Sequence, residues 1–456
     1  MSSHTRARRN LEYIDPAEFT PHFSWKKAGA SSARNVYCEG VALPAIAKRF
    51  GTPVYVYSRK AIEESLAELE SGLGNLPHRI CFAVKANGNL TILKLLARRG
   101  CGFDIVSGGE LDHLGHIGVS GDRIVFSGVG KTREEIRHAL RYKTGQKSNS
   151  GILQFNIESE AELEILLQEA GKVASNAGNI TAVSIRVNPD VKAGGHPHIS
   201  TGLHEHKFGL DWPAARKLYL AHRDSKLIKW QGISAHIGSQ IVSLNPFHQA
   251  LKRLASYLLE LRKNGVELKY LDFGGGLAVR YTKERPASRK DYARMIADVV
   301  RPLGVHLLLE PGRSIIAPAG VLLSRVIYSK RNSRKAFVII DAAMNDMMRP
   351  VLYDAPHPIT QIQETAESKA AASKERVDIV GQVCESGDCF LQGWPLGELQ
   401  SDELVAIWAA GAYGMAQASN YNARCRPAEV LVHGTSANLI RRRESFRDLL
   451  RSDVLA

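Results

Sequence analysis

The sequence predicts a (β/α)8 barrel, a TIM-like α/β fold, joined to a second, mostly antiparallel β-domain. Three observations lead to this prediction. Short β-rich runs alternate with helical patterns between about Arg79 and Gly312, strand-like runs joined by turns follow Arg313, and 456 residues exceed one ordinary domain. We expect the barrel to span residues 46–313, and a β-barrel or sandwich with a C-terminal helix to span 1–45 and 314–456.

The barrel prediction depends on how many β-rich runs the first part of the chain contains. Helical patterns separate successive runs, and the amphipathic stretches 158–170 and 246–264 are the clearest of them. The β-rich runs are residues 80–86, 102–107, 123–128, 152–159, 182–189, 230–238, 270–277 and 306–312. Eight parallel strands with helices between them are typical of a closed barrel.

The second domain is predicted from a change of pattern after Arg313. Apolar runs rich in β-branched residues follow one another without helical spacing, at 321–329, 336–343, 377–384, 404–413 and 428–434. Residues 437–450 are charged and amphipathic, so we expect a helix there.

Composition narrows the class of protein. The formal net charge of +14 is compatible with nucleic-acid binding, a solvated basic surface or a site for anions. Because basic residues are spread along the chain, we favour the solvated surface and expect no nucleic-acid partner.

The six cysteines lack paired or metal-ligand spacing, so we expect neither a disulfide framework nor a metal site. No apolar run suits a membrane helix and residues 1–10 lack a secretory apolar segment, so we expect a cytoplasmic protein with no membrane partner.

Reactive residues of such a barrel sit where its strands end, because the loops there converge on one face. The first run ends at Lys85, in a stretch otherwise too apolar to solvate an ammonium group. A lysine in such surroundings needs an anionic or a covalent partner. An ion pair, or a side chain that extends to water, is the alternative to a Schiff base.

The last two runs end in residues suited to an anion. Gly274, Gly275 and Gly276 would let backbone amides approach a phosphate, although a glycine run is often only a tight turn. Glu310, Gly312 and Arg313 follow the eighth run. An acid can keep a pyridine ring protonated and an arginine can bind a carboxylate, whereas a simple Glu–Arg ion pair is the alternative.

The sixth run contributes His236 and Ser239. The histidine could stack on a planar cofactor or exchange protons, although a lone histidine on a strand is usually structural. A lysine, a phosphate cradle, an acid and an arginine at one barrel mouth are more specific together than singly. They indicate pyridoxal 5'-phosphate (PLP).

These residues lie in motifs that resemble the diaminopimelate decarboxylases, within the fold type III PLP enzymes. The resemblance runs from about Pro53 to the C-terminus. Its motifs are FAVKAN (82–87), GFDIVSGGEL (102–111), FNIES (155–159), RVNPD (186–190), HPHISTGL with KFG (196–203, 207–209), HIGSQ (236–240), LDFGGGL (271–277), EPGRSI (310–315), NDMMRPVLYDA (345–355), CESGD (384–388), AYG (412–414) and SNYN (419–422). CESGD and the RP-x-LYDA stretch separate this family most clearly from the alanine racemases.

The resemblance implies a role for each matching residue. Lys85 would bind PLP covalently, His236 would stack on its ring, and Glu310 would pair with its pyridine nitrogen. The phosphate would be surrounded by Ser239, Gly274, Gly275, Gly276 and Gly312. Tyr413 would close over the cofactor, and the segment 196–209 would cover the site.

For the substrate, the resemblance implies that carboxylate is bound by Arg313, Arg349 and Tyr353 and that Glu385 recognises the distal amino-acid end. Without the motif, Arg349 and Tyr353 could be surface neighbours. Cys384 would reach in from a second subunit, so a homodimer would complete each site. It is our candidate for the general acid, with Lys85 as the competing one, because a thiol is largely protonated near neutrality.

The resemblance implies PLP-dependent decarboxylation of meso-diaminopimelate to L-lysine, the last step of lysine biosynthesis. A substrate without the distal carboxylate would leave arginine charge unpaired, so ornithine and lysine should be poor substrates. A decarboxylase or racemase acting on D-lysine, ornithine or arginine, and a non-catalytic PLP-binding protein, are the alternatives. The chain departs from the family pattern at Ala343, Cys425 and residues 416–418, which puts local backbone geometry in doubt.

Overall fold

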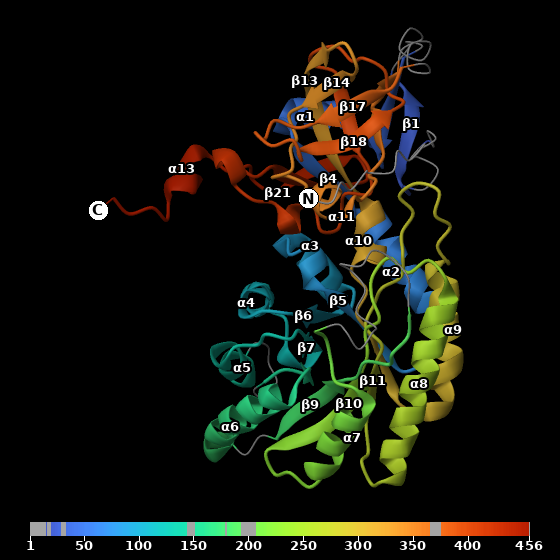
Figure 1. Ribbon diagram of the computed structural model, residues 1–456, viewed down its shortest axis with the longest axis vertical. Coiled ribbons are helices and arrows are strands. Elements are labelled where there is room, and N and C mark those ends of the chain that lie inside the picture. The colour runs from blue at the N-terminus through green and yellow to red at the C-terminus, as the bar shows by residue number, and fades with distance from the viewer. Residues whose placement is uncertain are drawn as a thin grey trace. The chain divides into compact units, whose positions relative to one another are not determined.

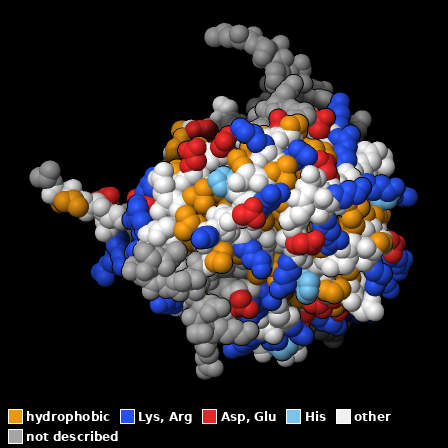
Figure 2. Space-filling model, turned by 90° about the horizontal axis from the view of Figure 1, so that it is seen from below, with side chains coloured by type: hydrophobic (Ala, Val, Ile, Leu, Met, Phe, Trp, Pro, Cys, Tyr) orange, Lys and Arg blue, Asp and Glu red, His pale blue; other side chains and the backbone are white. Residues whose placement is uncertain are grey.

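The computed structural model describes residues 15, 20–28, 33–143, 151–177, 180–192, 207–364 and 375–455. Two compact units divide the chain: one holds residues 65–279 and 285–314, and the other holds 1–64, 280–284 and 315–456. No helix in the described part of the chain is both long and apolar enough to cross a bilayer. On the face drawn in Figure 2, Lys and Arg side chains are spread among acidic and apolar ones.

The first unit is a closed barrel of parallel strands, which confirms the predicted fold class. Its strands in chain order are β5 (His78–Ala83), β6 (Gly102–Ile105), β7 (Ile124–Phe126), β8 (Gln154–Ile157), β9 (Thr181–Arg186), β10 (Ile228–Ser234), β11 (Tyr270–Asp272) and β12 (His306–Leu309). Each pairs with the next, and β12 closes the ring on β5 through Leu307–His78 and its neighbours. All eight predicted runs therefore form barrel strands.

Helices form the outer layer around these strands (Figure 1). They are α2 (Arg59–Leu73), α3 (Leu90–Arg98), α4 (Gly108–His116), α5 (Arg133–Leu140), α6 (Glu160–Ala177), α7 (Trp212–Ala221), α8 (Leu244–Lys263) and α9 (Arg289–Val300). Side-chain caps start several of them; Ser107 accepts from the Glu110 amide, and Thr132 forms a capping box with Glu135. The caps at Ser107 and Thr132 fix where the loops after β6 and β7 end and where α4 and α5 begin.

The second unit is built on a nine-stranded sheet that is mostly antiparallel, as predicted. Its strands are β4 (Val54–Ser58), β13 (Gly320–Arg331), β14 (Ala336–Ile340), β15 (Ile359–Gln361), β17 (Val377–Val380), β18 (Cys389–Trp394), β19 (Leu404–Ile407), β20 (Ala428–His433) and β21 (Ser436–Arg441). A smaller sheet holds β1 (Phe23–Lys27), β2 (Arg34–Cys38), β3 (Val41–Ala42) and β16 (Gln363–Glu364). The remaining α-helices of the described residues are short. They are α1 (Leu43–Phe50), α10 (Arg313–Ile316), α11 (Arg349–Tyr353) and α13 (Phe446–Leu450).

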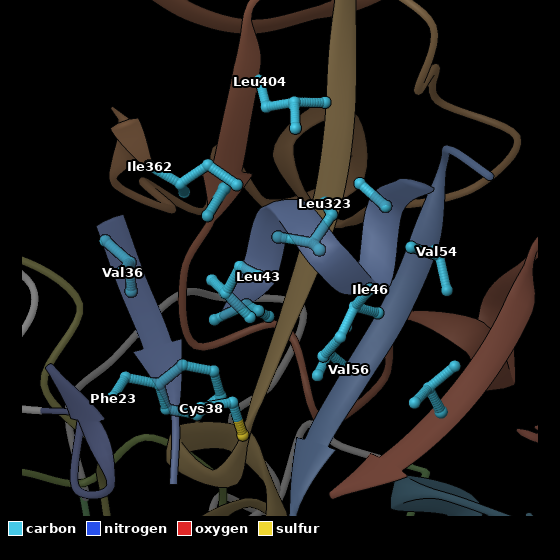
Figure 3. Packing of buried hydrophobic residues seen from close by; sticks show 14 of the residues in the cluster. Phe23, Val36, Cys38, Leu43, Ile46, Val54, Val56, Leu323, Ile362 and Leu404 are labelled. Carbon is cyan, nitrogen blue, oxygen red and sulfur yellow. The ribbon is translucent and has the colours of Figure 1, made fainter. Parts of the chain in front are cut away.

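The core of the second unit explains why it holds more of the N-terminal segment than the expected boundary at residue 46. Strand β4 pairs with both β13 and β20, and all five of its residues are buried. Figure 3 shows Val54 and Val56 of this strand near Leu43 and Ile46 of α1 in one apolar cluster. Moving these side chains from water into the cluster stabilises the unit by roughly 1.5–3 kcal/mol for each large one.

The prediction of a C-terminal helix over 437–450 was wrong for its first part. Residues Ser436–Arg441 form β21, which pairs antiparallel with β20 across a turn at Gly434, where φ is +60°. An open edge of β20 and a glycine that accepts a positive φ favour the hairpin over a helix. Only Phe446–Leu450 is helical, and Figure 1 shows the chain extending away from the β20–β21 hairpin at this end.

Candidate active site

Lys85 lies in a single 3-10 turn that follows β5, at the mouth of the barrel. Its Nζ donates to Asp104 Oδ2 at 2.5 Å, and Asp104 on β6 is fully buried whereas the lysine side chain is 39% exposed. Asp104 Oδ1 is buried and has no hydrogen-bond partner among the described residues. The amine of Lys85 therefore forms an ion pair with a buried carboxylate and is still accessible to a small molecule.

Two further acids lie beside this pair, on the last two barrel strands. Asp272 ends β11 and Glu310 follows β12, and their carboxyl groups are hydrogen-bonded to each other. Burial raises the pKa of Asp272 to about 6 and that of Glu310 well above its ordinary value, with neighbouring carboxylates adding to the shift in Glu310. The pair therefore holds a proton near neutral pH, and we place that proton on Glu310.

Asn156 connects the two acids. Its Nδ2 donates to Asp272 Oδ2 at 3.0 Å and lies 3.5 Å from Glu310 Oε1, while Ser127 Oγ lies 3.4 Å from the same glutamate oxygen. Gln154 Nε2 donates to Asn156 Oδ1 at 2.9 Å, which fixes the orientation of the amide. Glu310, the acid that would face a cofactor, is therefore oriented by Asn156 and Ser127 as well as by Asp272.

His236 follows β10 and is held in one tautomer. Its Nδ1 accepts from the Gly275 amide at 3.2 Å, so the ring proton of the neutral form is on Nε2. Burial, and then the positive charges of Arg186 and Lys85, hold its pKa well below the ordinary range. A neutral, fixed ring suits stacking on a planar group better than proton transfer.

The glycines at the strand ends allow close backbone approach. Gly274 has φ +62°, and a Cβ there would lie 2.7 Å from His236 Nδ1. A Cβ on Gly275 would meet the Glu310 carbonyl oxygen at 2.4 Å, and one on Gly276 would meet the Gly238 carbonyl oxygen at 2.3 Å. A Cβ on Gly312 would lie 2.8 Å from that of Ala86, beside Lys85. Side chains at these positions would displace the histidine, the acid or the lysine turn.

Arg313 is buried and donates to Ser239 Oγ through Nε at 3.2 Å and through Nη2 at 3.1 Å. The guanidinium and the hydroxyl together offer donors for an anion, next to the glycine-rich loops. This is the chemistry that a phosphate or a carboxylate requires.

The donor set of the barrel mouth fits PLP. An amine on Lys85 can react with an aldehyde, a protonated Glu310 can bond a pyridine nitrogen, and the neutral ring of His236 can cover a planar ring. Ser239, Arg313 and the glycine amides are suited to a phosphate.

The second unit gathers the remaining expected residues. Arg349 is the first residue of α11 and is buried, so it is not a surface neighbour of Tyr353. Its Nη1 donates to Tyr281 Oη at 2.8 Å and lies 2.7 Å from His357 Nε2. Tyr353 ends the same helix and accepts from Gln417 Nε2 at 3.4 Å.

The CESGD motif forms an exposed turn between β17 and β18. The Cys384 amide donates to Asn422 Oδ1 at 2.9 Å, and Glu385 accepts from the Tyr421 hydroxyl. Asp388 is buried and accepts from the amides of Val383 at 2.7 Å and Met344 at 2.8 Å. The aspartate thus shapes the turn, and the thiol and the glutamate of the motif remain exposed.

Tyr413 and the departures from the family pattern lie in the same unit. Tyr413 has φ +57°, an unusual conformation for a bulky residue and typical of a functional constraint. Ala343 is buried and does not require the left-handed conformation that would favour glycine. The alanine is therefore compatible with the local backbone.

Sequence reasoning missed several residues of the site. Asp104 lies in the GFDIVSGGEL motif and Asp272 in the LDFGGGL motif. Each is a single acid in an otherwise apolar strand, which is the signal that could have identified it. Glu110, whose pKa burial raises to about 7, follows in the same motif as Asp104. His357 and Tyr281 gave no comparable signal.

Most of the expected covering segment 196–209 lies outside the described residues. Its last residues are anchored to the barrel: the Gly209 amide donates to Glu158 Oε2 at 3.1 Å, and Arg186 lies over the Phe208 ring at 4.9 Å. Arg186 also donates to Glu158 Oε1 at 3.0 Å. A buried ion pair therefore holds the end of this segment beside His236.

Comparisons with known proteins agree with this geometry. Residues 59–317 match the family model described as pyridoxal-dependent decarboxylase, pyridoxal binding domain. A diaminopimelate decarboxylase of Pseudomonas fluorescens is 47% identical over 92% of this chain and 97% of its own length, and one of Haemophilus influenzae is 44% identical over 91% and 96%. The crystal structure of diaminopimelate decarboxylase from Helicobacter pylori complexed with L-lysine has a TM-score of 0.83 and 38% identity, and covers 90% of this chain and 98% of that one.

Proposed function

The chain belongs to the diaminopimelate decarboxylases, a family of pyridoxal-dependent decarboxylases, and from this we propose how its residues divide the work of the reaction. The protein converts meso-2,6-diaminopimelate to L-lysine and carbon dioxide with PLP as cofactor. The observation that carries the residue assignment is the amine of Lys85 held on Asp104 beside a proton-sharing acid pair.

The barrel unit binds and tunes the cofactor. When bound, PLP supplies an aldehyde that takes the substrate amine and a protonated ring that accepts the electron pair left by carbon dioxide. Lys85 would provide the amine that holds the cofactor, and Asp104 would accept a hydrogen bond from the lysine ammonium group whenever that amine is free. Glu310, held by Asp272 and Asn156, keeps a proton at the ring nitrogen.

The neutral imidazole of His236 would stack on the pyridine ring of the cofactor, so that water would have less access to the reacting carbon. Ser239, Gly274, Gly275, Gly276 and Gly312 surround the phosphate, and Arg313 donates to Ser239 at the same place. Each of these assignments uses a residue that the barrel holds by backbone or by a buried partner.

The second unit recognises the substrate and returns the proton. Arg349, with Tyr353 and Arg313, binds carboxylate, and Glu385 binds the distal ammonium group. Cys384 donates the proton to the carbon that has lost carbon dioxide. Tyr413 closes over the cofactor.

A homodimer completes the site in this proposal, with Cys384 supplied by a second copy of the chain. The CESGD turn is exposed, which suits a contact with another chain. The C-terminal segment also exposes apolar side chains: Phe446 is 75% exposed and Leu450 is 66% exposed. The proposed location is the cytoplasm.

The test of this proposal offers PLP-loaded protein a panel of amino acids and measures carbon dioxide and L-lysine. The panel is meso-diaminopimelate, D- and L-lysine, ornithine and arginine. We expect turnover of meso-diaminopimelate with equal amounts of both products, and negligible turnover of the others. Preferential turnover of D-lysine or ornithine would contradict the substrate assignment.

A further inference from the structure

We propose that His357 and Tyr281 are positioning residues that fix the guanidinium of Arg349, and that this arrangement determines the preference for a substrate with a distal carboxylate. The inference rests on the proposed role of Arg349 in binding carboxylate. It assigns a function to two side chains that the sequence did not single out.

Two separate segments of the second unit meet at Arg349. The arginine begins α11, His357 follows that helix before β15, and Tyr281 belongs to the short segment 280–284. The histidine is 1% exposed and the arginine 4%. Contacts between buried groups on independent segments restrict the guanidinium more than a surface pair would.

The hydrogen bonds determine the protonation state of His357. Its Nδ1 lies 2.8 Å from the carbonyl oxygen of Trp408, which can only accept, so Nδ1 carries a hydrogen. Its Nε2 lies 2.7 Å from Nη1 of Arg349, which can only donate, so Nε2 presents a lone pair. The imidazole is therefore neutral and in a single tautomer.

Tyr281 fixes the other directions of the guanidinium. Its hydroxyl accepts the second hydrogen of Nη1 at 2.8 Å, and the Arg349 Cζ lies 5.1 Å from the centre of its ring. The Tyr281 and His357 rings meet edge to face, with centres 4.8 Å apart. The two contacts together use both hydrogens of Nη1 and fix the plane of the guanidinium.

The proposed preference for a substrate with a distal carboxylate depends on the neutral state of His357 and Tyr281. Both partners are neutral: the imidazole and the phenol accept hydrogen bonds from Nη1 of Arg349 and bring no charge of their own. A guanidinium that is already held in one direction can form charge-assisted hydrogen bonds with a carboxylate at a smaller cost in side-chain entropy. A ligand with hydrogen in place of the carboxylate does not form those bonds, so the clamp should discriminate by charge.

The test compares the affinities of PLP-loaded protein for L-lysine and for 1,5-diaminopentane, which differ by one carboxylate. Both affinities can be measured by calorimetry and by the visible absorption of the cofactor. His357→Phe removes the acceptor for Nη1, so we expect the ratio of the two affinities to fall about tenfold or more. In turnover of diaminopimelate, KM should rise by a similar factor with a smaller change in kcat.

His357→Gln is the conservative variant, because its neutral amide oxygen can accept from Arg349 near the place of Nε2. It should restore most of the ratio. Thr360→Val is the matched control: it removes a buried 2.9 Å hydrogen bond from the Trp408 indole without touching Arg349, and should leave the ratio unchanged. Tyr281→Phe removes only the hydroxyl and should lower the ratio several-fold.

Arg349→Met separates this inference from the proposed function beneath it. If Arg349→Met collapses the ratio and His357→Phe does not, the positioning role is wrong. If Arg349→Met itself leaves the ratio at the wild-type value, the proposed role of Arg349 fails. Should His357→Phe not fold, an unchanged ratio in Tyr281→Phe would overturn the inference.

Discussion

The barrel mouth and the CESGD turn hold their reactive groups in opposite ways. In the barrel, Lys85, Asp272 and Glu310 lie among buried carboxyl groups, and burial shifts the pKa of both acids. In the second unit, Cys384 and Glu385 are exposed and are held by hydrogen bonds to Asn422 and Tyr421. In the function that we propose, the barrel tunes the cofactor, whereas the exposed turn acts on the substrate after a second chain covers it.

This comparison predicts that barrel substitutions change the cofactor spectrum, and that substitutions at the CESGD turn change kcat or KM and leave that spectrum unchanged. Lys85→Ala should have the largest effect, because both cofactor attachment and substrate exchange need its amine. We expect kcat to fall by roughly 10⁴-fold or more, with loss of the visible absorption of the bound cofactor. A variant that keeps that absorption would place the attachment site elsewhere.

Cys384→Ala should have the next largest effect. Removing a general acid should lower kcat by roughly 10²–10⁴-fold, while the visible spectrum and the affinity for PLP stay at wild-type values. Cys389→Ala is the matched control, since that thiol lies on β18 and donates to the Leu391 carbonyl oxygen instead of lying in the turn. Equal losses in the two variants would contradict the assignment of the acid.

The acid pair predicts a pH dependence of stability in PLP-free protein. Because the pKa of Asp272 is about 6 when folded and near 3.8 when unfolded, the folded state binds more protons between these values, and its stability falls as pH rises through this window. Asp272→Asn removes that loss, so the free energy of unfolding of the variant, relative to that of wild type, should rise by about 2 kcal/mol from pH 4 to pH 6. Parallel curves for the two proteins would show that Asp272 has an ordinary pKa.

Tyr421→Phe should have the smallest effect. It removes the hydroxyl that donates to Glu385, so the carboxylate loses one of its positioning contacts. We expect KM for diaminopimelate to rise a few-fold, with kcat and the cofactor spectrum unchanged. A change in the spectrum would mean that the turn also shapes the cofactor site of its own chain.

The barrel could be predicted from the sequence because its strands are short apolar runs with reactive residues at their ends. Lys85, His236 and Glu310 follow β5, β10 and β12, where the loops of such a fold converge. Asp104 and Asp272 were missed because an acid inside a strand gives no motif by itself. Asp104 comes next to Lys85, and Asp272 next to Glu310, only when the barrel closes.

The second unit was harder to predict because distant segments build it. Strand β4 (Val54–Ser58) is buried at every position, so its pattern does not show which sheet it joins; its partners β13 and β20 lie more than half the chain away. Strand β21 has a charged, amphipathic sequence that also suits a helix, and the free edge of β20 decided the outcome. The contact of Tyr281 with Arg349 likewise joins residues that lie 68 positions apart in the sequence.

The central claim, that one chain supplies Lys85 and a second supplies Cys384, can be tested by mixing two inactive variants. Lys85→Ala and Cys384→Ala proteins would be unfolded, mixed in equal amounts, refolded with PLP and assayed for L-lysine. We predict recovery of about one quarter of wild-type activity, because half of the dimers are mixed and each has one intact site. A mixture of Lys85→Ala with Glu310→Gln should recover none; no recovery in the first mixture, with mixed dimers detected by mass, would contradict the claim.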